Sequence, residues 1–166
     1  MMHQAFVALG SNLNNPILQV KNALRTLGQI KHTRLIKHSS LYQTAPVDCP
    51  SLAHQAVPDF INAVAEVETS LSPQDLLQAL HVIENQAGRE RPYINAPRVL
   101  DCDLLLYEQL EIAQPTLTLP HPRIHLRGFV LLPLFEIAPQ LYLPNHGKIA
   151  TLITPNLSAG ITKLST

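Results

Sequence analysis

Apolar and polar residues alternate along the chain in a way that predicts short strands separated by amphipathic helices. Residues 4–9 are almost all apolar and are followed by the turn-forming residues 10–12, which predicts a buried strand running into a turn. A helix is expected next, because Asn15 suits the N-cap, Pro16 the first helical position and Gly28 the end. The apolar stripe of this helix is Ile17, Val20, Leu24 and Leu27.

Two further strands are predicted on either side of a proline-rich loop. Residues 35–44 alternate loosely and residues 60–69 alternate clearly, as expected for a half-buried antiparallel strand. Between them, residues 45–58 contain prolines and no periodicity, and long loops of this kind are often functional. The two predicted faces of the second strand are Ile61, Ala63, Ala65 and Val67 on one side, and Phe60, Asn62, Val64, Glu66 and Glu68 on the other.

A second helix and another strand follow. Ser72-Pro73-Gln74-Asp75 resembles a capping box, so we expect a helix that begins at Pro73 and ends before Gly88. After a loop, residues 99–107 are expected to form a strand. A second extended segment should precede Pro120, and residues 126–138 should be helical.

The order of these elements predicts the fold class. Strand, helix, strand, strand, helix, strand is the ferredoxin-like βαββαβ arrangement, an α/β (α+β) fold whose helices pack on one face of an antiparallel sheet. An additional C-terminal region of strand and helix would follow it. The second face of the sheet is then free to carry a site, although this fold serves many functions and does not by itself indicate one.

Composition and charge narrow the class of protein. The 166 residues fit one domain, residues 1–166, and a hydrophobic content of 46% is enough for a sizeable core. Twelve basic and twelve acidic residues give zero net charge, so no global field attracts nucleic acid or an anionic membrane. No apolar run approaches the roughly 20 residues of a membrane-spanning helix, and no signal-peptide pattern is present, so we expect a cytoplasmic protein. Cys49 and Cys102 form no C-x-x-C motif and are interpreted as ordinary thiols.

Two aspartates occupy alternate positions in the otherwise apolar strand predicted at residues 99–107. Side chains two apart on a strand point to the same side with Cα atoms about 6.6 Å apart, so Asp101 and Asp103 can share hard cations. The residues of the other parity should point into the core; they are Leu100, Cys102, Leu104 and Leu106. The pattern favours a metal site, with a solvated sheet edge as the alternative.

Arginines are concentrated in the loop that leads into this acidic strand. Arg89, Arg91 and Arg98 lie within ten residues of one another. A guanidinium group can bind two phosphate oxygens at once, and divalent cations held by carboxylates bridge phosphate oxygens. The loop and the strand together therefore indicate that the ligand is a nucleotide polyphosphate. The alternative is that these arginines only neutralise nearby carboxylates such as Glu84 and Glu90.

Other common signatures are missing from the sequence. It contains no G-x-x-x-x-G-K-[ST], no G-x-G-x-x-G and no kinase catalytic-loop motif, which disfavours P-loop and protein-kinase chemistry. Its few aromatic residues form no pair typical of RNA-binding strands. His121 and His125 have helical metal-ligand spacing, but Pro122 lies between them, which favours a polar loop or a single phosphate contact over zinc.

A series of short motifs spans nearly the whole chain. They are Val7-Ala8-Leu9-Gly10-Ser11-Asn12-Leu13, Asn62-Ala63, Glu84-x-x-x-Gly88-Arg89-x-Arg91, Ala96-Pro97-Arg98-x-x-Asp101-x-Asp103-Leu104-Leu105, Leu119-Pro120-His121, Arg127-Gly128-Phe129 and Pro133-Leu134-Phe135-Glu136-Ile137-Ala138-Pro139. In this order the chain resembles the 6-hydroxymethyl-7,8-dihydropterin pyrophosphokinases of folate biosynthesis. The Pro-Arg-x-x-Asp-x-Asp motif with the downstream His and Arg-Gly-Phe is the most specific part of the resemblance.

The resemblance implies an enzyme that transfers the pyrophosphoryl group of ATP to the pterin hydroxymethyl oxygen and releases AMP, with two Mg²⁺ ions. By position, Asp101 and Asp103 resemble the metal ligands, and Arg89 and Arg98 resemble mobile phosphate-binding arginines; these are the four implied catalytic residues. The implied ATP contacts are Leu77, His81, Glu84, Arg91, Arg98, Leu104, Thr118, His121 and Arg127. The implied pterin contacts are Thr44, Val47, Phe60, Asn62, Asp101 and Phe129.

Two other classes of function stay open at this point. Another two-metal phosphotransferase or hydrolase would use the same carboxylates with water or a different alcohol. A non-enzymatic regulator that binds a heterocycle would keep the pocket but would not need paired aspartates beside three arginines. A flat heterocycle is favoured by Phe60, Asn62 and Phe129. The expected partners are therefore small molecules, and neither nucleic acid nor membrane is expected. The protein is also expected to be a monomer.

Overall fold

The computed structural model describes residues 1–45, 59–88 and 99–164. The first part of the chain contains β1 (His3–Ser11), α1 (Pro16–Leu27), β2 (Thr33–His38), β3 (Tyr42–Thr44), β4 (Phe60–Thr69), α2 (Pro73–Ala87) and β5 (Asp101–Tyr107). The second part contains β6 (Ile112–Gln114), β7 (Leu117–Leu119), α3 (Gly128–Ile137), β8 (Tyr142–Leu143), β9 (Gly147–Lys148), α4 (Pro155–Ser158) and β10 (Ile161–Lys163). Short 3₁₀ turns precede α3 and follow β9, at Ile124–Leu126 and Ile149–Leu152.

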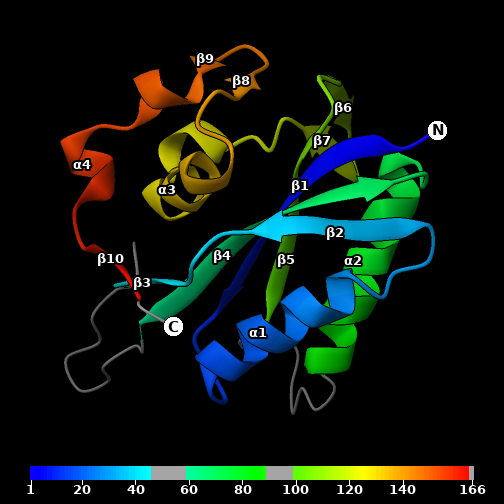
Figure 1. Cartoon of the computed structure of the whole chain (residues 1–166), viewed down its shortest axis with the longest axis horizontal. Coiled ribbons are helices and arrows are strands. Elements are labelled where there is room, and N and C mark those ends of the chain that lie inside the picture. The colour runs from blue at the N-terminus through cyan, green and yellow to red at the C-terminus, as the bar shows by residue number, and fades with distance from the viewer. Residues whose placement is uncertain (46–58, 89–98, 165–166) are drawn as a thin grey trace.

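The main sheet is antiparallel, with the strand order β10-β3-β4-β1-β5 and with β2 also paired to β4 (Figure 1). If β2 and β3 are taken as one interrupted strand, this is the βαββαβ order that the sequence predicts. The prediction of a single strand over residues 35–44 was wrong at its centre. There the Ser39 hydroxyl accepts the Val64 N–H at 3.0 Å, so a side chain takes the place of a backbone carbonyl in the ladder.

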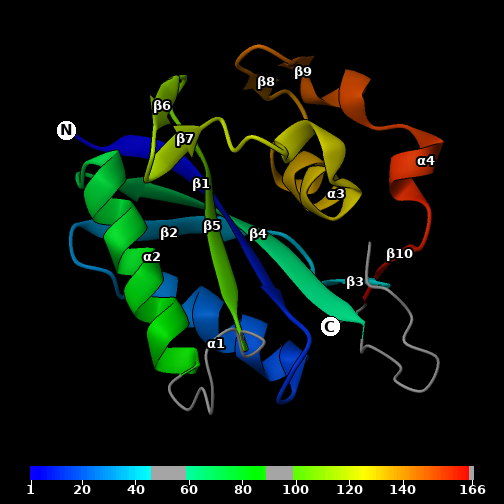
Figure 2. The same cartoon turned by 180° about the vertical axis from the view of Figure 1, so that it is seen from behind.

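α1 and α2 pack on one face of the sheet, as expected for this arrangement (Figure 2). The alternation predicted for β4 is confirmed, because the residues that it buries against these helices are Ile61, Ala63, Ala65 and Val67. The Ser72 hydroxyl caps α2 by accepting the Asp75 N–H at 3.1 Å. Asn15 precedes α1 in a left-handed conformation and makes no side-chain cap, so the prediction of a capping role for it was wrong.

α3 covers part of the opposite face, which the sequence had left free. A second apolar cluster joins Phe6, Ala8 and Val64 of the sheet to α3 through Val130 and Leu134. α3, β8, β9 and α4 group together, away from α1 and α2, in both views (Figures 1 and 2). In the described ranges, no helix is long and apolar enough to span a membrane.

β5 begins two residues later than predicted and changes faces along its length. Leu100, Cys102 and Leu104 are buried on the helix side, as expected. The register with β1 then shifts, since Phe6 pairs with Leu106 while Val7 pairs with Leu104. This irregularity turns Leu106 into the second cluster under α3, so its predicted parity was wrong.

Candidate active site

A cavity of about 230 Å³ opens between the sheet and the start of α3. The strand register builds its floor, because residues directly opposite one another on antiparallel strands project to the same side. In one row Gly10 of β1 lies between Asn62 of β4 and Asp101 of β5, and in the next row Ala8 lies beside Asp103. Small residues in the central strand therefore leave a hollow between the amide and the carboxylates. The lining residues are Ala8, Leu9, Gly10, Thr44, Ala45, Phe60, Asn62, Ala63, Asp101, Asp103, Arg127, Phe129 and Val130.

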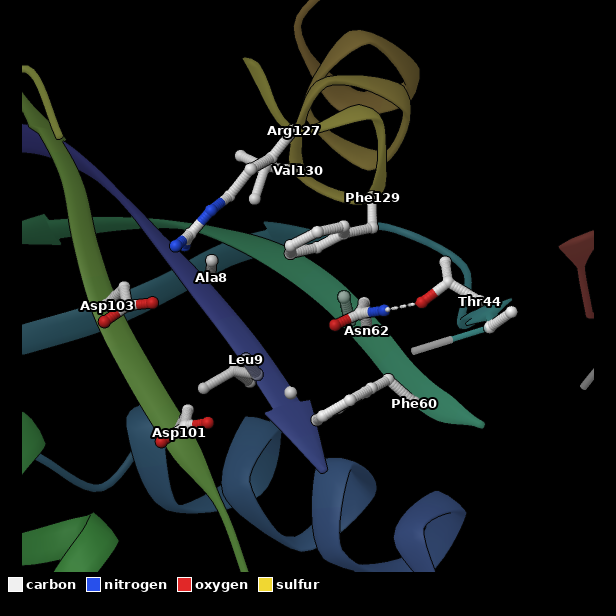
Figure 3. A pocket seen from close by; sticks show the side chains of 13 residues that line it. Ala8, Leu9, Thr44, Phe60, Asn62, Asp101, Asp103, Arg127, Phe129 and Val130 are labelled. Atoms are coloured by element: carbon white, nitrogen blue, oxygen red, sulfur yellow. Dashed lines mark hydrogen bonds between the residues drawn. The ribbon is translucent and has the colours of Figure 1, made fainter. Parts of the chain in front are cut away.

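Two aromatic rings and one amide form the side of this cavity next to β3. Figure 3 shows the Phe129 ring from α3 and the Phe60 ring from β4 on either side of Asn62. Asn62 is only 6% exposed, and its Nδ2 donates a hydrogen bond to Thr44 Oγ1 at 3.2 Å. A Cβ atom at position 10 would lie 2.9 Å from Asn62 Oδ1, so Gly10 is needed for this amide orientation. The arrangement suits a flat ring with hydrogen-bonding groups at its edge.

The two aspartates face this cavity from β5, on the side opposite the rings (Figure 3). Both are half-buried, whereas Cys102 between them is 3% exposed and points into the helix-side core. Burial raises the pKa of the Cys102 thiol, and the charges of Glu84, Asp103 and Asp101 raise it further. Cys102 is therefore a protonated core residue, which agrees with its interpretation as an ordinary thiol.

A second cavity of about 280 Å³ lies along the outer edge of β5, between α2 and the β6–β7 hairpin. Asp103 lines this cavity as well as the first, so one carboxylate stands where the two meet. The expected ATP contacts on α2, β5 and the hairpin come together here. The lining residues are Leu77, His81, Glu84, Cys102, Asp103, Leu104, Pro115, Thr116, Leu117, Thr118, His121 and Pro122.

Glu84 and His121 each have a defined structural contact at this second cavity. Glu84 Oε2 accepts the Cys102 backbone N–H at 2.9 Å, which ties α2 to the outer edge of β5. The His121 backbone N–H donates to the Leu105 carbonyl at 2.9 Å. Burial lowers the pKa of the His121 imidazole; the charge of Asp103 opposes this shift, while Arg127 and Arg123 add to it. His121 Nδ1 accepts the Arg123 backbone N–H at 3.2 Å, so in the neutral imidazole Nε2 carries the proton and can donate a hydrogen bond.

Neither Arg127, an implied ATP contact, nor His125, considered above only for its spacing from His121, is among the residues that line the second cavity. Arg127 lines the first cavity and extends from the start of α3 toward Ala8 (Figure 3), with its Cζ 5.7 Å from the centre of the Phe129 ring. His125 stacks on His146 at 4.1 Å between ring centres, whereas His121 lines the second cavity. The rings of His121 and His125 thus have separate environments.

Four predicted site residues lie outside the described residues; they are Val47, Arg89, Arg91 and Arg98. The described residues that flank the arginine-rich segment are both anchored. The Gly88 N–H donates to the Glu84 carbonyl at 2.9 Å, and the Ser11 hydroxyl donates to the Val99 carbonyl at 2.5 Å. Gly88 is therefore bonded to Glu84, a residue of the second cavity, and Val99 is held two residues before Asp101 of the first.

Several lining residues were missed by sequence reasoning. Gly10 was interpreted only as part of a turn, and Ala8 only as part of a buried strand. The signal that could have found them is the register between β1, β4 and β5, which one sequence does not reveal. Pro115, Leu117 and Pro122 line the second cavity because the hairpin folds back over β5, a long-range contact without a local sequence pattern.

Two adjoining cavities lie on this antiparallel α+β sheet, one lined by aromatic rings and one at the open edge of β5, and their geometry suits two small ligands side by side. A sequence model of the 7,8-dihydro-6-hydroxymethylpterin-pyrophosphokinase family matches residues 6–139. This chain belongs to that family.

Two bacterial relatives match over more than nine-tenths of their length. The chain is 46% identical over 152 residues to the 2-amino-4-hydroxy-6-hydroxymethyldihydropteridine pyrophosphokinase of Haemophilus influenzae, covering 92% of each chain. It is 39% identical over 164 residues to the protein of the same description from Pseudomonas aeruginosa, covering 99% of this chain and 98% of that one.

Solved structures agree with the fold. The Plasmodium falciparum HPPK-DHPS wild type with pteroate matches 98% of this chain with a TM-score of 0.72 and 16% sequence identity. The match covers 46% of that solved chain, so this chain spans about half of its length.

Proposed function

We propose that this protein transfers the pyrophosphoryl group of ATP to the hydroxymethyl oxygen of 6-hydroxymethyl-7,8-dihydropterin and releases AMP, as a step of folate biosynthesis. The observation that carries the proposal is the position of Asp103, which lines both cavities. A group transfer between two substrates requires that they meet at one point, and a shared carboxylate supplies that point. Membership of the pyrophosphokinase family supports the same reaction.

The pterin binds in the first cavity in this proposal. Phe60 and Phe129 would stack on its two faces, and stacked aromatic contacts add about 0.5–1.5 kcal/mol beyond the area they bury. Asn62 is already oriented by Thr44, so its Oδ1 is available as an acceptor for N–H groups at the pterin edge. The hydroxymethyl group would then point across Gly10 toward Asp101. Val47 stays a predicted pterin contact.

ATP binds along the outer edge of β5 in this proposal. Leu77, Leu104 and Leu117 supply apolar walls for the adenine, and Thr118 and the neutral His121 supply hydrogen-bonding groups. The phosphates would extend toward Asp103 and the start of β5. The Arg89, Arg91 and Arg98 guanidinium groups stay predicted phosphate ligands, and Arg127 would approach the phosphates from the first cavity.

Asp101 and Asp103 fit a magnesium site by the chemistry of their donors. Both are carboxylates on one face of β5, and Mg²⁺ is usually held by one or two carboxylates, with water and phosphate oxygens as its other ligands. Within the described ranges, no group of three or more His, Cys, Asp or Glu could hold a metal, so the remaining ligands would come from ATP and water. Two Mg²⁺ ions bound there would offset phosphate charge and polarise the β-phosphoryl group.

The side chains then orient a single displacement. The hydroxymethyl oxygen forms a bond to the β-phosphorus and loses its proton to solvent, and the bond from that phosphorus to the oxygen bridging to the α-phosphate breaks, releasing AMP. Asp101 would accept a hydrogen bond from the attacking hydroxyl and hold its lone pair toward the phosphorus. The predictions of a monomer and of a cytoplasmic location stay predictions.

The test is identification of the nucleotide product. Protein, ATP, Mg²⁺ and the hydroxymethyl dihydropterin are incubated, and nucleotides are separated by ion-exchange chromatography, with a matched reaction that lacks the pterin. We expect AMP in equal amount to a pterin pyrophosphate, and none without the pterin. ADP would indicate a simple kinase, and phosphate or pyrophosphate released without the pterin would indicate a hydrolase.

A further inference from the structure

The Glu136 carboxylate, near the end of α3, contacts the start of β3 and lies close to β10. One carboxylate oxygen accepts the Tyr42 hydroxyl at 2.6 Å, and the other accepts the Ser40 hydroxyl at 3.0 Å. The Ser40 backbone N–H donates to both oxygens, at 3.0 and 3.1 Å. Lys163 Nζ of β10 lies 4.0 Å away. We call this set of contacts the Glu136 clamp.

The clamp works with a charged acceptor. Burial acts to raise the pKa of Glu136, but hydrogen bonds from Tyr42 and Ser40 and the charge of Lys163 outweigh it, so the pKa lies below its usual value. Burial raises the pKa of Tyr42, and the hydrogen bond to Glu136 and the charge of Glu136 raise it further. At neutral pH an ionised carboxylate therefore accepts from a protonated phenol, and hydrogen bonds to a charged group are stronger than neutral ones.

Both elements that the Glu136 clamp joins, β3 and α3, also carry residues that line the first cavity. β3 has only three residues, and Thr44, two positions after Tyr42, accepts the hydrogen bond from Asn62. Phe129 precedes Glu136 by seven residues on α3, about two turns of roughly 3.6 residues, so both point from the same side of the helix. Glu136 itself lines neither the first nor the second cavity.

We propose that Glu136 is a positioning residue for the pterin: it holds α3 against β3 so that Phe129 and Thr44 keep the spacing that the heterocycle needs. This inference rests on the proposed function, because it concerns the affinity of the same cavity for the same substrate. The alternative is that Glu136 contributes to stability alone and leaves the geometry of the cavity unchanged.

The test compares Glu136→Gln and Tyr42→Phe with the native protein in steady-state kinetics and in binding of a non-hydrolysable ATP analogue with Mg²⁺. We expect KM for the pterin to rise roughly 5- to 30-fold in Glu136→Gln, as loss of a charge-assisted contact allows. The ATP analogue should bind within about twofold of native affinity, because the second cavity has no contact with the clamp. The matched control is Glu68→Gln, a carboxylate on β4 paired with Arg34 at 2.6 Å, which should change neither constant.

A double variant tests whether Tyr42 acts through Glu136, and the unfolding temperature distinguishes positioning of the cavity walls from stability alone. If Tyr42 acts through Glu136, Tyr42→Phe should raise KM further by less than twofold in a Glu136→Gln background. An unchanged pterin KM in Glu136→Gln, with only a lower unfolding temperature, would overturn the proposal. If Glu136→Gln does not fold, Tyr42→Phe alone carries the same expectation and the same contradiction. Failure of the proposed function is distinct, because native protein would then form no AMP.

Discussion

The two faces of the central sheet have the same strands but opposite uses. On the helix face of β4, Ile61 and Ala65 are 4% and 0% exposed and pack under α1 and α2. On the other face, Phe60 and Asn62 of the same strand line a cavity. The difference is coverage, since α1 and α2 bury one face along its length whereas α3 covers only part of the other. The site lies where that coverage ends.

β5 contains the boundary between the open part of this face and the part that α3 covers. Asp101 and Asp103 face the first cavity, but after the register shift the same face carries Leu105 and Leu106, which are buried under α3. An irregularity of this kind re-aims side chains, and here it separates the polar from the apolar part of one face. Substitutions on the cavity side of β4 and β5 should therefore change function, and those on the helix side should change stability.

The largest effect is expected at the aspartates. Asp101→Ala and Asp103→Ala should each reduce turnover by roughly 10²- to 10⁴-fold, because a lost metal ligand removes several kcal/mol of transition-state stabilisation. Both variants should stay folded, since half-exposed polar residues change the free energy of unfolding by about 0.5 kcal/mol or less. Steady-state assays and thermal unfolding measure the two quantities. Near-native turnover with Mg²⁺ in both variants would contradict the assignment.

The opposite outcome is expected one residue from Asn62, on the helix face. Ile61→Ala removes a buried side chain and should lower the free energy of unfolding by about 2–5 kcal/mol. Urea denaturation followed by circular dichroism measures this cost. The fraction that stays folded should bind the pterin with native affinity, because Ile61 does not line the cavity. A large change in pterin affinity, corrected for the folded fraction, would show that the two faces are not independent.

Asn62→Ala should weaken pterin binding instead of folding, and its free-energy cost should be smaller than that of Ile61→Ala. The variant leaves the polar edge of a bound pterin without its partner, which costs about 1–3 kcal/mol, or roughly a 5- to 150-fold weaker affinity. Calorimetric titration measures the pterin and the ATP analogue separately. Equal losses for both ligands would argue that Asn62 supports the fold of the whole site instead of reading one substrate.

The smallest effect concerns acid stability. The pKa of Glu136 is depressed in the folded protein, so its stabilising contribution is present above the unfolded pKa and is lost as pH falls through the folded value. We expect the unfolding temperature of native protein to fall more steeply than that of Glu136→Gln as the pH drops below about 4.5. Thermal scans across pH 3 to 6 check this, and parallel curves for the two proteins would refute it.

The sequence predicted the individual helices and strands better than the contacts between neighbouring strands. The parity of β4 and the Ser72 cap follow from local rules of burial and capping, and both were correct. The interruption at Ser39 was not predictable, because the hydroxyl replaces a carbonyl only in the presence of Val64 on the neighbouring strand. The same applies to the shift at Leu105, which depends on pairing with β1.

The candidate site divides in the same way. The motifs contain Asp101, Asp103, Asn62 and Phe129, the family resemblance adds Phe60, and the structure brings these residues together. Alternation within one strand could not reveal that Gly10 and Ala8 open the floor between them, since that depends on register across three strands. It also could not reveal that Asp103 alone of the two aspartates lines both cavities among the described residues.

The most direct test of the central claim is a crystal structure of the protein with Mg²⁺, a non-hydrolysable ATP analogue and the hydroxymethyl pterin. We expect density for the heterocycle between Phe60 and Phe129, and for the nucleotide base beside Leu104. We also expect the phosphates and the hydroxymethyl group to meet next to Asp103. Density for both ligands in one cavity, or for phosphates remote from Asp103, would contradict the proposed reaction site.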